Sequence, residues 1–556
     1  MTTTFETRLT PDLVRHYTDA GYWTDRVITD FLDEHAGATP DATAFVDSRR
    51  SITFGELKQE ADRCALGLLE LGVGPGDVVS FQLPNWIEWI VLHLAVTRIG
   101  AVNNPLIPIY RDREVGFMME LVGSKLVVVP REFRGYDYPG MVERVRPQLP
   151  DLEHVLVVDR PAGAASSDGA ASTDGTLDWD EFLATPWEER RDPAELAALR
   201  PDPNDVTLVI FTSGTTGEPK GVLHTHNTLV AANNPLPQRL GIDADTVFHM
   251  ASTLAHLTGF LYGARLGIQN GRPCVLQDVW DATRFCELVE EHRVSYTSAA
   301  TPFLHDLLQT AASTDRDLSS LRLFCCMGAP IPRVMVRRAQ ELLPGMTVLG
   351  GWGQTENALV TLGIPGDPEA KIVETDGYPW PGMSIRVVGP DGQPRAATEE
   401  GALQVEGPFV TVGYAHRPQL TEQAFHDGWF DTGDLATIDE DGYVKIVGRT
   451  KDIIIRGGEN IPVAYVENIL YEHPDIESLA VVGIPDPRLQ EQAVLVCQMR
   501  DGTEPLTLES LRAFLGEKGV AKQYWPEHVR VVDALPRTAS GKIQKFKVRD
   551  TVKDAR

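Results

Sequence analysis

Residues 212–221 carry four hydroxyl side chains, three glycines and a lysine within ten positions, directly after the apolar run 208–211. Glycines let backbone N–H groups approach anionic oxygens, hydroxyls donate hydrogen bonds, and Lys220 supplies a point charge. The segment therefore predicts a loop that binds the phosphates of a nucleotide, with a plain surface turn as the alternative. No Walker A motif occurs, and no G-x-G-x-x-G lies between a strand and a helix, so neither a P-loop NTPase nor a dinucleotide-binding fold is expected.

Four further motifs follow in order along the chain. They are GWGQTE (351–356), GWFDTGD (428–434), GRTKDIIIRGGENIPVAYVE (448–467) and LPRTASGKIQK (535–545). Together with TSGTTGEPKG (212–221) they resemble the AMP-forming adenylating enzyme superfamily, which comprises acyl- and aryl-CoA synthetases, adenylation domains and luciferases. Residues 16–47 resemble the openings of medium-chain, cyclohexanecarboxylate-type and aryl-acid CoA ligases.

The resemblance implies that a carboxylate attacks the α-phosphate of ATP and that pyrophosphate leaves. Because both reactants are anions, such a site must supply positive charge and alignment. The resemblance places the β- and γ-phosphates on seven residues. These are Thr212, Ser213, Gly214, Thr215, Thr216, Gly217 and Lys220.

The other nucleotide contacts are also implied by the resemblance. Thr355 would bind the α-phosphate, and Glu356 would hold Mg²⁺, for which one carboxylate beside the phosphates is sufficient. Asp434 and Arg449 would bind the ribose. Three residues, Gly328, Ala329 and Pro330, would form a turn against the adenine edge, and the ring of Trp352 would stack on adenine. Asp431 is expected to organise its turn.

The same resemblance assigns the residues of the two reaction steps. Lys542, in the pattern P-x-T-x-x-G-K, would contact the carboxylate and the α-phosphate together, although a basic tail residue is the alternative. Lys451 would be the interdomain hinge. Gly458 would let the pantetheine arm of CoA approach, with a hairpin turn as the alternative.

The acid pocket is the least defined part of the expected site. His256 matches the family's aromatic-or-His position, but Leu254 and Ala255 replace the usual Pro and Phe, which leaves the pocket shape open. Thr301 and Gly351 are expected to line the same pocket. A histidine in an apolar run is otherwise a core residue.

Composition excludes several protein classes. Lys and Arg total 51 against 79 Asp and Glu, a net charge of −28, which argues against nucleic-acid binding and a polybasic membrane surface. The apolar stretch 87–102 is too short and too polar to span a bilayer, and six cysteines are too few for a disulfide scaffold. Adjacent Cys325 and Cys326 are expected to be buried. With no signal peptide at the N-terminus, we expect a cytoplasmic protein whose oligomeric state is left open.

The elements expected from periodicity alternate between helix and strand. Residues 54–72 and 90–97 predict helices, and 77–83 and 125–130 predict strands, which favours an α/β fold with a largely parallel sheet. Residues 160–175 predict an exposed loop. We expect a large multi-sheet α/β domain over residues 1–449 and a small mobile α+β domain over 450–556, whose charge is close to neutral.

The predicted function is ATP-dependent activation of a carboxylic acid as an acyl-adenylate, followed by transfer to CoA. The sequence names neither the acid nor the acceptor. The same adenylating chemistry would also serve a carrier protein or an amine as acceptor, or nitrite activation for diazo formation. A non-catalytic nucleotide-binding relative is disfavoured by the intact motif residues, and a phosphotransferase would release orthophosphate in place of pyrophosphate.

Overall fold

The structure is a computed structural model that describes residues 5–159, 176–212, 219–329, 331–449, 454–456, 459–461, 463–538 and 541–553. The chain divides into two compact units. Unit 1 comprises residues 1–298, 355–358 and 407–425, and unit 2 comprises 299–354, 359–406 and 426–556. The expected domain boundary between residues 449 and 450 falls within unit 2 and stays a prediction. The expected loop at 160–175 lies outside the described residues.

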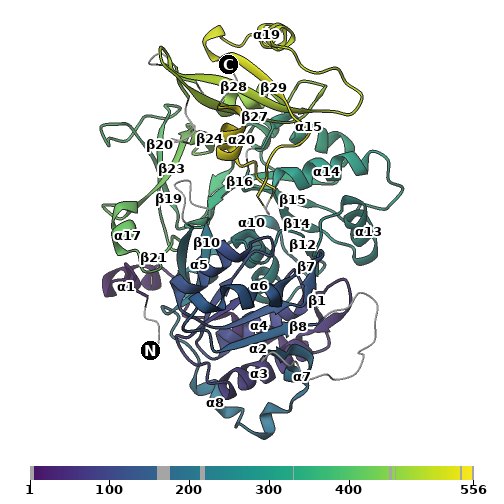
Figure 1. The fold of residues 1–556 in the computed structure, drawn as a ribbon, viewed down its shortest axis with the longest axis vertical. Coiled ribbons are helices and arrows are strands. Elements are labelled where there is room, and N and C mark those ends of the chain that lie inside the picture. The colour runs from purple at the N-terminus through teal and green to yellow at the C-terminus, as the bar shows by residue number, and fades with distance from the viewer. Residues whose placement is uncertain are drawn as a thin grey trace. The chain divides into compact units, whose positions relative to one another are not determined.

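An eight-stranded sheet lies in unit 1 (Figure 1). Its strands, in spatial order, are β21 (Gly413–Tyr414), β11 (Lys220–Thr225), β10 (Val206–Thr212), β4 (Val102–Pro105), β3 (Val78–Phe81), β5 (Ser124–Pro130), β8 (His154–Val158) and β9 (Leu177–Asp178). The strands from β10 to β9 are parallel, whereas β11 and β21 add an antiparallel edge. The strands expected at 77–83 and 125–130 are confirmed as β3 and β5.

The helices beside this sheet follow from their sequences. Helix α3 (Phe54–Glu70) begins at a capping box, in which Thr53 and Glu56 each accept a hydrogen bond from the other's backbone N–H. It ends just before Gly72, whose φ of +80° favours glycine. Helix α4 (Ile87–Arg98) is buried on every side up to Thr97, as its nearly unbroken apolar sequence requires. Both expected helices are confirmed.

A second group of hydrogen-bonded strands, almost all in unit 1, is also mainly parallel. Its strands, in spatial order, are β14 (Tyr296–Ala299), β12 (Phe248–Met250), β13 (Cys274–Leu276), β1 (Thr43–Val46) and β2 (Ser51–Thr53). Among these five described strands, only the pair β1–β2 is antiparallel. One continuous helical segment connects β12 to β13: α11 (Leu257–Gly259), the π-helix η3 (Phe260–Arg265) and α12 (Leu266–Asn270).

Unit 2 begins with parallel strands β15 (Leu323–Cys326) and β16 (Thr347–Gln354), next to helices α14 (Thr301–Ala311) and α15 (Arg333–Leu342). Cys325 and Cys326 are buried in β15, as expected, and burial raises the pKa of Cys326 to about 12. An antiparallel group follows: β19 (Ser384–Val388), β20 (Gly401–Glu406), β23 (Trp429–Ile438) and β24 (Val444–Arg449). Strands β16, β23 and β24 carry Trp352, Asp434 and Arg449.

The C-terminal sheet of unit 2 is built on the long hairpin β27 (Ile476–Asp486) and β28 (Gln490–Met499). Its other strands are β25 (Ile454–Arg456), β26 (Glu459–Ile461) and β29 (His528–Val531). Both faces of β27 are covered. Leu479 and Val481 pack in a core with helices α18 (Val463–Leu470) and α19 (Leu508–Glu517), whereas Ala480 and Val482 pack with α20 (Lys545–Val552). Two-sided burial explains the continuous apolar run in this strand.

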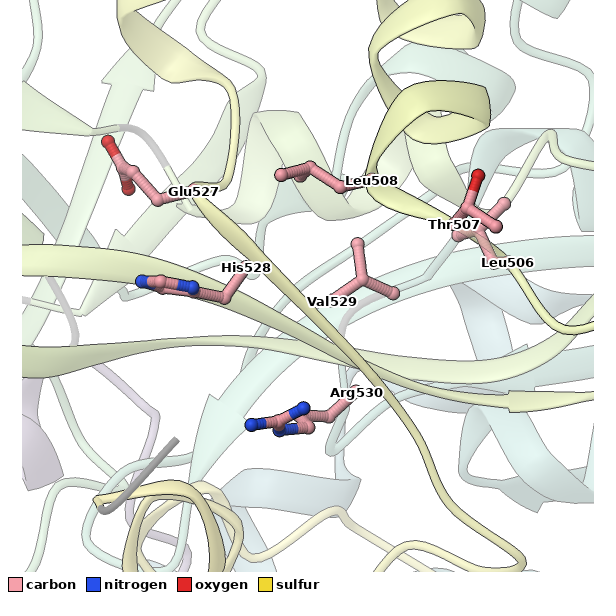
Figure 2. Close-up of a pocket in the computed structure, with 7 residues that line it drawn as sticks. All are labelled: Leu506, Thr507, Leu508, Glu527, His528, Val529 and Arg530. Atoms are coloured by element: carbon pink, nitrogen blue, oxygen red, sulfur yellow. The ribbon is translucent and has the colours of Figure 1, made fainter. Parts of the chain in front are cut away.

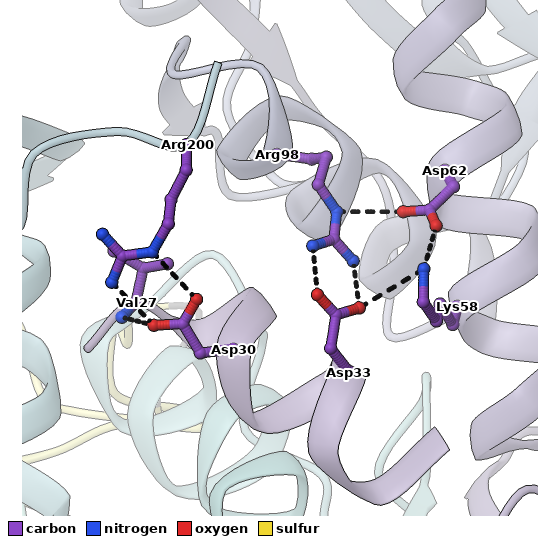
Figure 3. Close-up of polar contacts among 7 residues, drawn as sticks. All are labelled: Val27, Asp30, Asp33, Lys58, Asp62, Arg98 and Arg200. Atoms are coloured by element: carbon purple, nitrogen blue, oxygen red, sulfur yellow. Dashed lines mark hydrogen bonds and ion pairs between the residues drawn. The ribbon is translucent and has the colours of Figure 1, made fainter. Parts of the chain in front are cut away.

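Charged side chains connect three helices of unit 1 (Figure 3). The guanidinium of Arg98, at the end of α4, binds both carboxylate oxygens of Asp33 on α2 (Ile28–Ala38), each at 2.7 Å. Its Nε lies 2.9 Å from Asp62 on α3, and Lys58 contacts both carboxylates. Although partial burial opposes it, Arg98 and Lys58 lower the pKa of Asp33. The network therefore stabilises unit 1 while Asp33 is ionised.

We predict that Asp33→Asn lowers the free energy of unfolding by about 1 kcal/mol at pH 7, because 41% of the Asp33 side chain is exposed and solvent screens the pair. The folded-state pKa of Asp33 is depressed, so this stabilisation is present above the unfolded pKa of about 4 and is lost as the pH falls. Thermal melting should show a wild-type advantage at pH 7 that shrinks below pH 4. Asp12→Asn, in an exposed pair with Arg15, is the control and should change little. An equal Asp33→Asn effect at all pH values would contradict the account.

Candidate functional site

The two ends of the expected phosphate loop are held by a strand pair. Thr212 is the last residue of β10, Lys220 is the first of β11, and the two face each other in the antiparallel register. The expected residues from Ser213 to Gly217 lie outside the described part of the chain.

Tyr414, on β21, contacts Lys220 and Glu356 in unit 1. Its hydroxyl donates a hydrogen bond to Glu356 Oε1 at 3.1 Å, and the Nζ of Lys220 lies 5.3 Å from its ring centroid. Burial raises the pKa of Tyr414, and the negative charge of Glu356 raises it further, so the phenol keeps its proton. A cation and a carboxylate are thus held at one buried aromatic residue. Tyr414 was not predicted from the sequence, because a tyrosine in an apolar run carries no spacing signal.

The backbone of Thr355 and Glu356 is also fixed within unit 1. The ring Nε2–H of His224 donates to the carbonyl of Thr355 at 2.7 Å, and the N–H of Thr411 donates to the carbonyl of Glu356. Burial lowers the pKa of His224 to about 4, so the ring is neutral and acts here as a donor. His224 was not predicted either, because a histidine in the polar run 224–228 carries no distinct signal.

In unit 2, three side chains donate to Asp434, which is only 3% exposed. Trp352 Nε1 and Gln354 Nε2 donate to Oδ2 at 2.8 and 3.0 Å, and Arg449 Nε donates to Oδ1 at 2.8 Å. Trp352 and Gln354 share one face of β16 because they are two residues apart, and Asp434 faces Arg449 across β23 and β24. The structure thus brings together three predicted residues and adds Gln354, which the motifs did not single out.

The geometry at Asp434 constrains what else it can bind. A carboxylate offers about four acceptor positions, and three are used by protein donors. An additional ligand with two hydroxyls would have to replace at least one of these donors. Asp431 has the turn-forming position that was expected of it, because its Oδ1 accepts from the N–H of Gly433 at 3.3 Å.

The expected adenine turn is partly described. Gly328 has a φ of +84°, a conformation that favours glycine, and it is exposed, whereas Ala329 after it is half-buried. Pro330 lies outside the described residues.

The expected acid-pocket residues fall into both units. In unit 1, His256 caps α11, where its Nδ1 accepts from the N–H of Thr258 at 3.3 Å. In unit 2, Thr301 is the first residue of α14, with its hydroxyl 3.7 Å from Cys326 Sγ. A Cβ at Gly351 would lie 2.8 Å from Leu362 Cδ1 and 3.0 Å from the carbonyl oxygen of Thr361, so a larger residue there would crowd its neighbours. The pocket itself stays a prediction.

Lys542 lies in a tight turn of unit 2. Its N–H donates to Thr538 Oγ1 at 3.0 Å, its carbonyl accepts from the N–H of Thr538 at 2.7 Å, and Gly541 has a φ of +80°. The spacing P-x-T-x-x-G-K therefore encodes this turn. Lys545 has a different role, since its Nζ pairs with the buried Glu467 at 2.8 Å. Lys451 and Gly458 lie outside the described residues.

A surface hollow of about 360 Å³ lies elsewhere in unit 2, between the segment before α19 and strand β29 (Figure 2). Its lining residues are Leu506, Thr507, Leu508, Glu527, His528, Val529 and Arg530. None of the motif residues lines it, and Glu527 and His528 are engaged with Arg456 and Gln492. The hollow is therefore separate from the motif residues of this unit.

The described residues bring no ready-made metal cluster together. Nowhere among them do three or more His, Cys, Asp or Glu side chains form a group that could hold a metal ion. A divalent ion at Glu356 would therefore need ligands from a nucleotide and from water. The described residues also include no helix that is long and apolar enough to cross a membrane.

The multi-sheet α/β fold is that of a known class. A model of the AMP-binding enzyme family matches residues 32–415, and one of the AMP-binding enzyme C-terminal domain matches residues 465–542. The chain therefore belongs to the AMP-binding enzyme family. The expected resemblance and fold class, including a large N-terminal and a small C-terminal part, are confirmed.

Individual relatives agree with this assignment. A medium-chain fatty-acid–CoA ligase of Escherichia coli (strain K12) is 36% identical over 538 residues, 96% of this chain and 92% of that protein. A salicylyl-CoA synthase / salicylate adenylyltransferase of a Streptomyces species is 32% identical over 545 residues, 97% of this chain and 96% of that protein. The crystal structure of the anthranilate CoA ligase AuaEII with anthranoyl-AMP superposes with a TM-score of 0.84 at 24% identity, over 96% of this chain and 98% of that one.

We predict that Asp434→Ala lowers the free energy of unfolding by about 1–3 kcal/mol, because it leaves buried donors of Trp352 and Gln354 without their acceptor. Urea denaturation measures the change. Asp431→Ala, three residues away and exposed, is the control and should cost less than about 1 kcal/mol. Equal losses in the two variants would contradict the bonding described at Asp434.

Proposed function

We propose that this chain activates a carboxylic acid with ATP as an acyl-adenylate, releases pyrophosphate, and transfers the acyl group to CoA. Membership of the AMP-binding family supports the nucleotide chemistry, and the names of the relatives support an acid–CoA ligase. The observation that carries the proposal is the arrangement of Lys220 and Glu356 at Tyr414, because it offers a cation for phosphate oxygens beside a carboxylate.

The donor set at Glu356 fits Mg²⁺. This ion prefers oxygen ligands, keeps several waters, and commonly binds through one or two carboxylates and the substrate's phosphates. Glu356 would supply that carboxylate, and the ion would neutralise charge on the phosphates. Lys220, with Thr212 at the other end of the loop, would bind the β- and γ-phosphates. Thr355, whose backbone His224 holds, would orient the α-phosphate.

Asp434, Trp352 and Arg449 would form the nucleoside part of the site. Three donors already hold the carboxylate of Asp434 in place, so an incoming ribose would exchange a hydroxyl for one protein donor. Arg449, whose side chain is 37% exposed, is the partner that would move away most readily, because its long side chain extends from the last residue of β24. The indole N–H bond of Trp352 fixes the ring's plane for stacking on adenine.

Lys542 would supply positive charge where the carboxylate attacks the α-phosphate, and its tight turn would position it. For thiol transfer, we propose that residues 450–556 move as a domain relative to 1–449 about Lys451, and that Gly458 lies beside the pantetheine arm. The two family models match on either side of that boundary, which supports it. A cytoplasmic location is also proposed, because all six cysteines are unpaired thiols.

The experiment that tests the proposal is a pyrophosphate-release screen over aliphatic and aromatic acids, with and without CoA. Nitrite with an arylamine is included to detect diazo formation. We expect acid-dependent pyrophosphate release and sustained turnover only with CoA. Turnover with an amine or a carrier protein in place of CoA would select that acceptor, and turnover with nitrite in place of the carboxylic acid would select diazo formation. Release of orthophosphate in place of pyrophosphate would contradict the proposal.

We predict that Lys542→Ala slows adenylate formation by roughly 10²–10³-fold, the range for loss of one preorganised electrostatic contact. Transfer of a supplied acyl-adenylate to CoA should be nearly unchanged. The two half-reactions are measured separately by single-turnover quench. Lys545→Ala is the control, because it breaks the ion pair with Glu467 and should lower stability without this asymmetry. Equal loss in both half-reactions would refute the role of Lys542.

We predict that Tyr414→Phe raises the Mg²⁺ concentration for half-maximal activity by about tenfold, since one hydrogen bond to a charged group is lost. Tyr414→Leu should also raise KM for ATP, because the ring under Lys220 is gone. Mg²⁺ titrations at saturating ATP measure the first effect. Tyr443→Phe, which loses a comparable bond to Asp367, is the matched control. An unchanged Mg²⁺ requirement in Tyr414→Phe would contradict the proposal that Glu356 binds the metal ion.

A further inference from the structure

A guanidinium in the core of unit 1 has no hydrogen-bond partner among the described residues. Arg265 is fully buried, and Nε, Nη1 and Nη2 are all unpaired in that part of the chain. Burial lowers the pKa of Arg265 to about 9 and is the only cause of the shift, so no carboxylate in the described chain offsets it. The group is therefore still cationic at neutral pH, and a buried charge without a partner is unfavourable.

The aromatic cluster that Arg265 contacts through Phe260 contains another unpaired donor, and no carboxylate contributes to the pKa shift of Arg265. Its guanidinium carbon lies 5.7 Å from the centroid of the Phe260 ring, and the rings of Trp89 and His93 lie 5.8 and 4.8 Å from the same centroid. The indole Nε1–H of Trp89 is buried and has no partner among the described residues. Burial and the charge of Arg265 lower the pKa of His93 to about 3, so its ring is neutral. Around Phe260 the protein thus presents a positive charge, an N–H donor and the ring Nε2 of His93, which also has no partner among the described residues.

The local backbone places this cluster on the helical segment that His256 caps. Phe260 and Arg265 are the first and last residues of the π-helix η3, and π-helices occur frequently at functional sites. Their five-residue separation is one π-turn, which accounts for the guanidinium lying over the ring. Arg265 is nine residues after His256, roughly 13 Å along the helix axis. A ligand near His256 would need about that reach to meet the guanidinium.

We propose that Arg265, with the indole N–H of Trp89, forms a buried binding site for a carboxylate or similar monovalent anion. The anion has two candidate sources: a second carboxylate at the far end of the activated acid, or a small free anion that occupies the core. The first source rests on the proposed function, because it makes Arg265 a specificity-determining residue of the acid site. The second source, a small free anion, does not depend on the proposed function.

The first arm of the test needs no turnover. The melting temperature of wild-type protein is measured while acetate or chloride is titrated into a sodium sulfate background at fixed ionic strength. A free-anion site predicts a saturable rise that Arg265→Met abolishes. Arg284→Met, an exposed arginine on helix α13 (Ala282–His292), is the matched control and should keep the rise.

The second arm compares octanoate with octanedioate in the pyrophosphate-release assay. If the activated acid supplies the anion, wild type should favour octanedioate, and Arg265→Met should reduce kcat/KM for the diacid by roughly 10–100-fold while sparing octanoate. Arg265→Lys keeps the charge and should retain part of the preference. Inactivity towards every acid would count against the proposed function alone, since the melting arm is independent of it.

Either response in wild type, lost in Arg265→Met, supports the site. If Arg265→Met folds and both the anion response and the acid preference are unchanged, internal water satisfies the guanidinium and the proposal is wrong. If Arg265→Met does not fold, the proposal is judged from the wild-type protein alone, by its anion-dependent melting temperature and its preference between octanoate and octanedioate. A wild-type protein with neither anion-dependent stabilisation nor a preference for the diacid overturns the proposal.

Discussion

The carboxylate of Asp434 is the constraint around which Trp352, Gln354 and Arg449 are organised in unit 2. It is almost fully buried, and a buried carboxylate is tolerated only with donors at its oxygens. Trp352 and Gln354 come from one face of β16, and Arg449 comes from β24. One side chain therefore fixes three strands at the ends where the sequence motifs lie. A group held in this way changes its partners only when a ligand offers equivalent donors.

Tyr414 has the corresponding role in unit 1, as a neutral side chain that contacts one cation and one carboxylate. Glu356 accepts a hydrogen bond from its hydroxyl, and the ammonium of Lys220 lies over its ring. A cation left over a ring remains available to phosphate oxygens, whereas a cation bound to a carboxylate would not. Gln354, Thr355 and Glu356 are consecutive, so a single short segment carries a residue of the Asp434 group, the residue held by His224 and the partner of Tyr414. This adjacency explains why the motif GWGQTE is so compact.

The sequence predicted those features that repeat a local pattern. Alternating periodicity identified β3, β5, α3 and α4, and the motifs identified Trp352, Asp434 and Arg449 as members of one site. Gln354, His224 and Tyr414 were not predicted. Each of these acts through a partner more than 50 residues away, and only the folded chain brings such pairs together. Arg265 was not predicted for a related reason. An arginine within an apolar stretch indicates an exposed side chain until the fold shows that it is buried and has no hydrogen-bond partner among the described residues.

The central claim is that a carboxylate oxygen of the acid attacks the α-phosphate of ATP. Transfer of ¹⁸O from a labelled acid tests it most directly, with the products analysed by mass spectrometry after turnover with ATP and CoA. The account predicts that one labelled oxygen per turnover appears in AMP and none in pyrophosphate. Label in orthophosphate, or AMP that is formed without label while the acid is consumed, would contradict it.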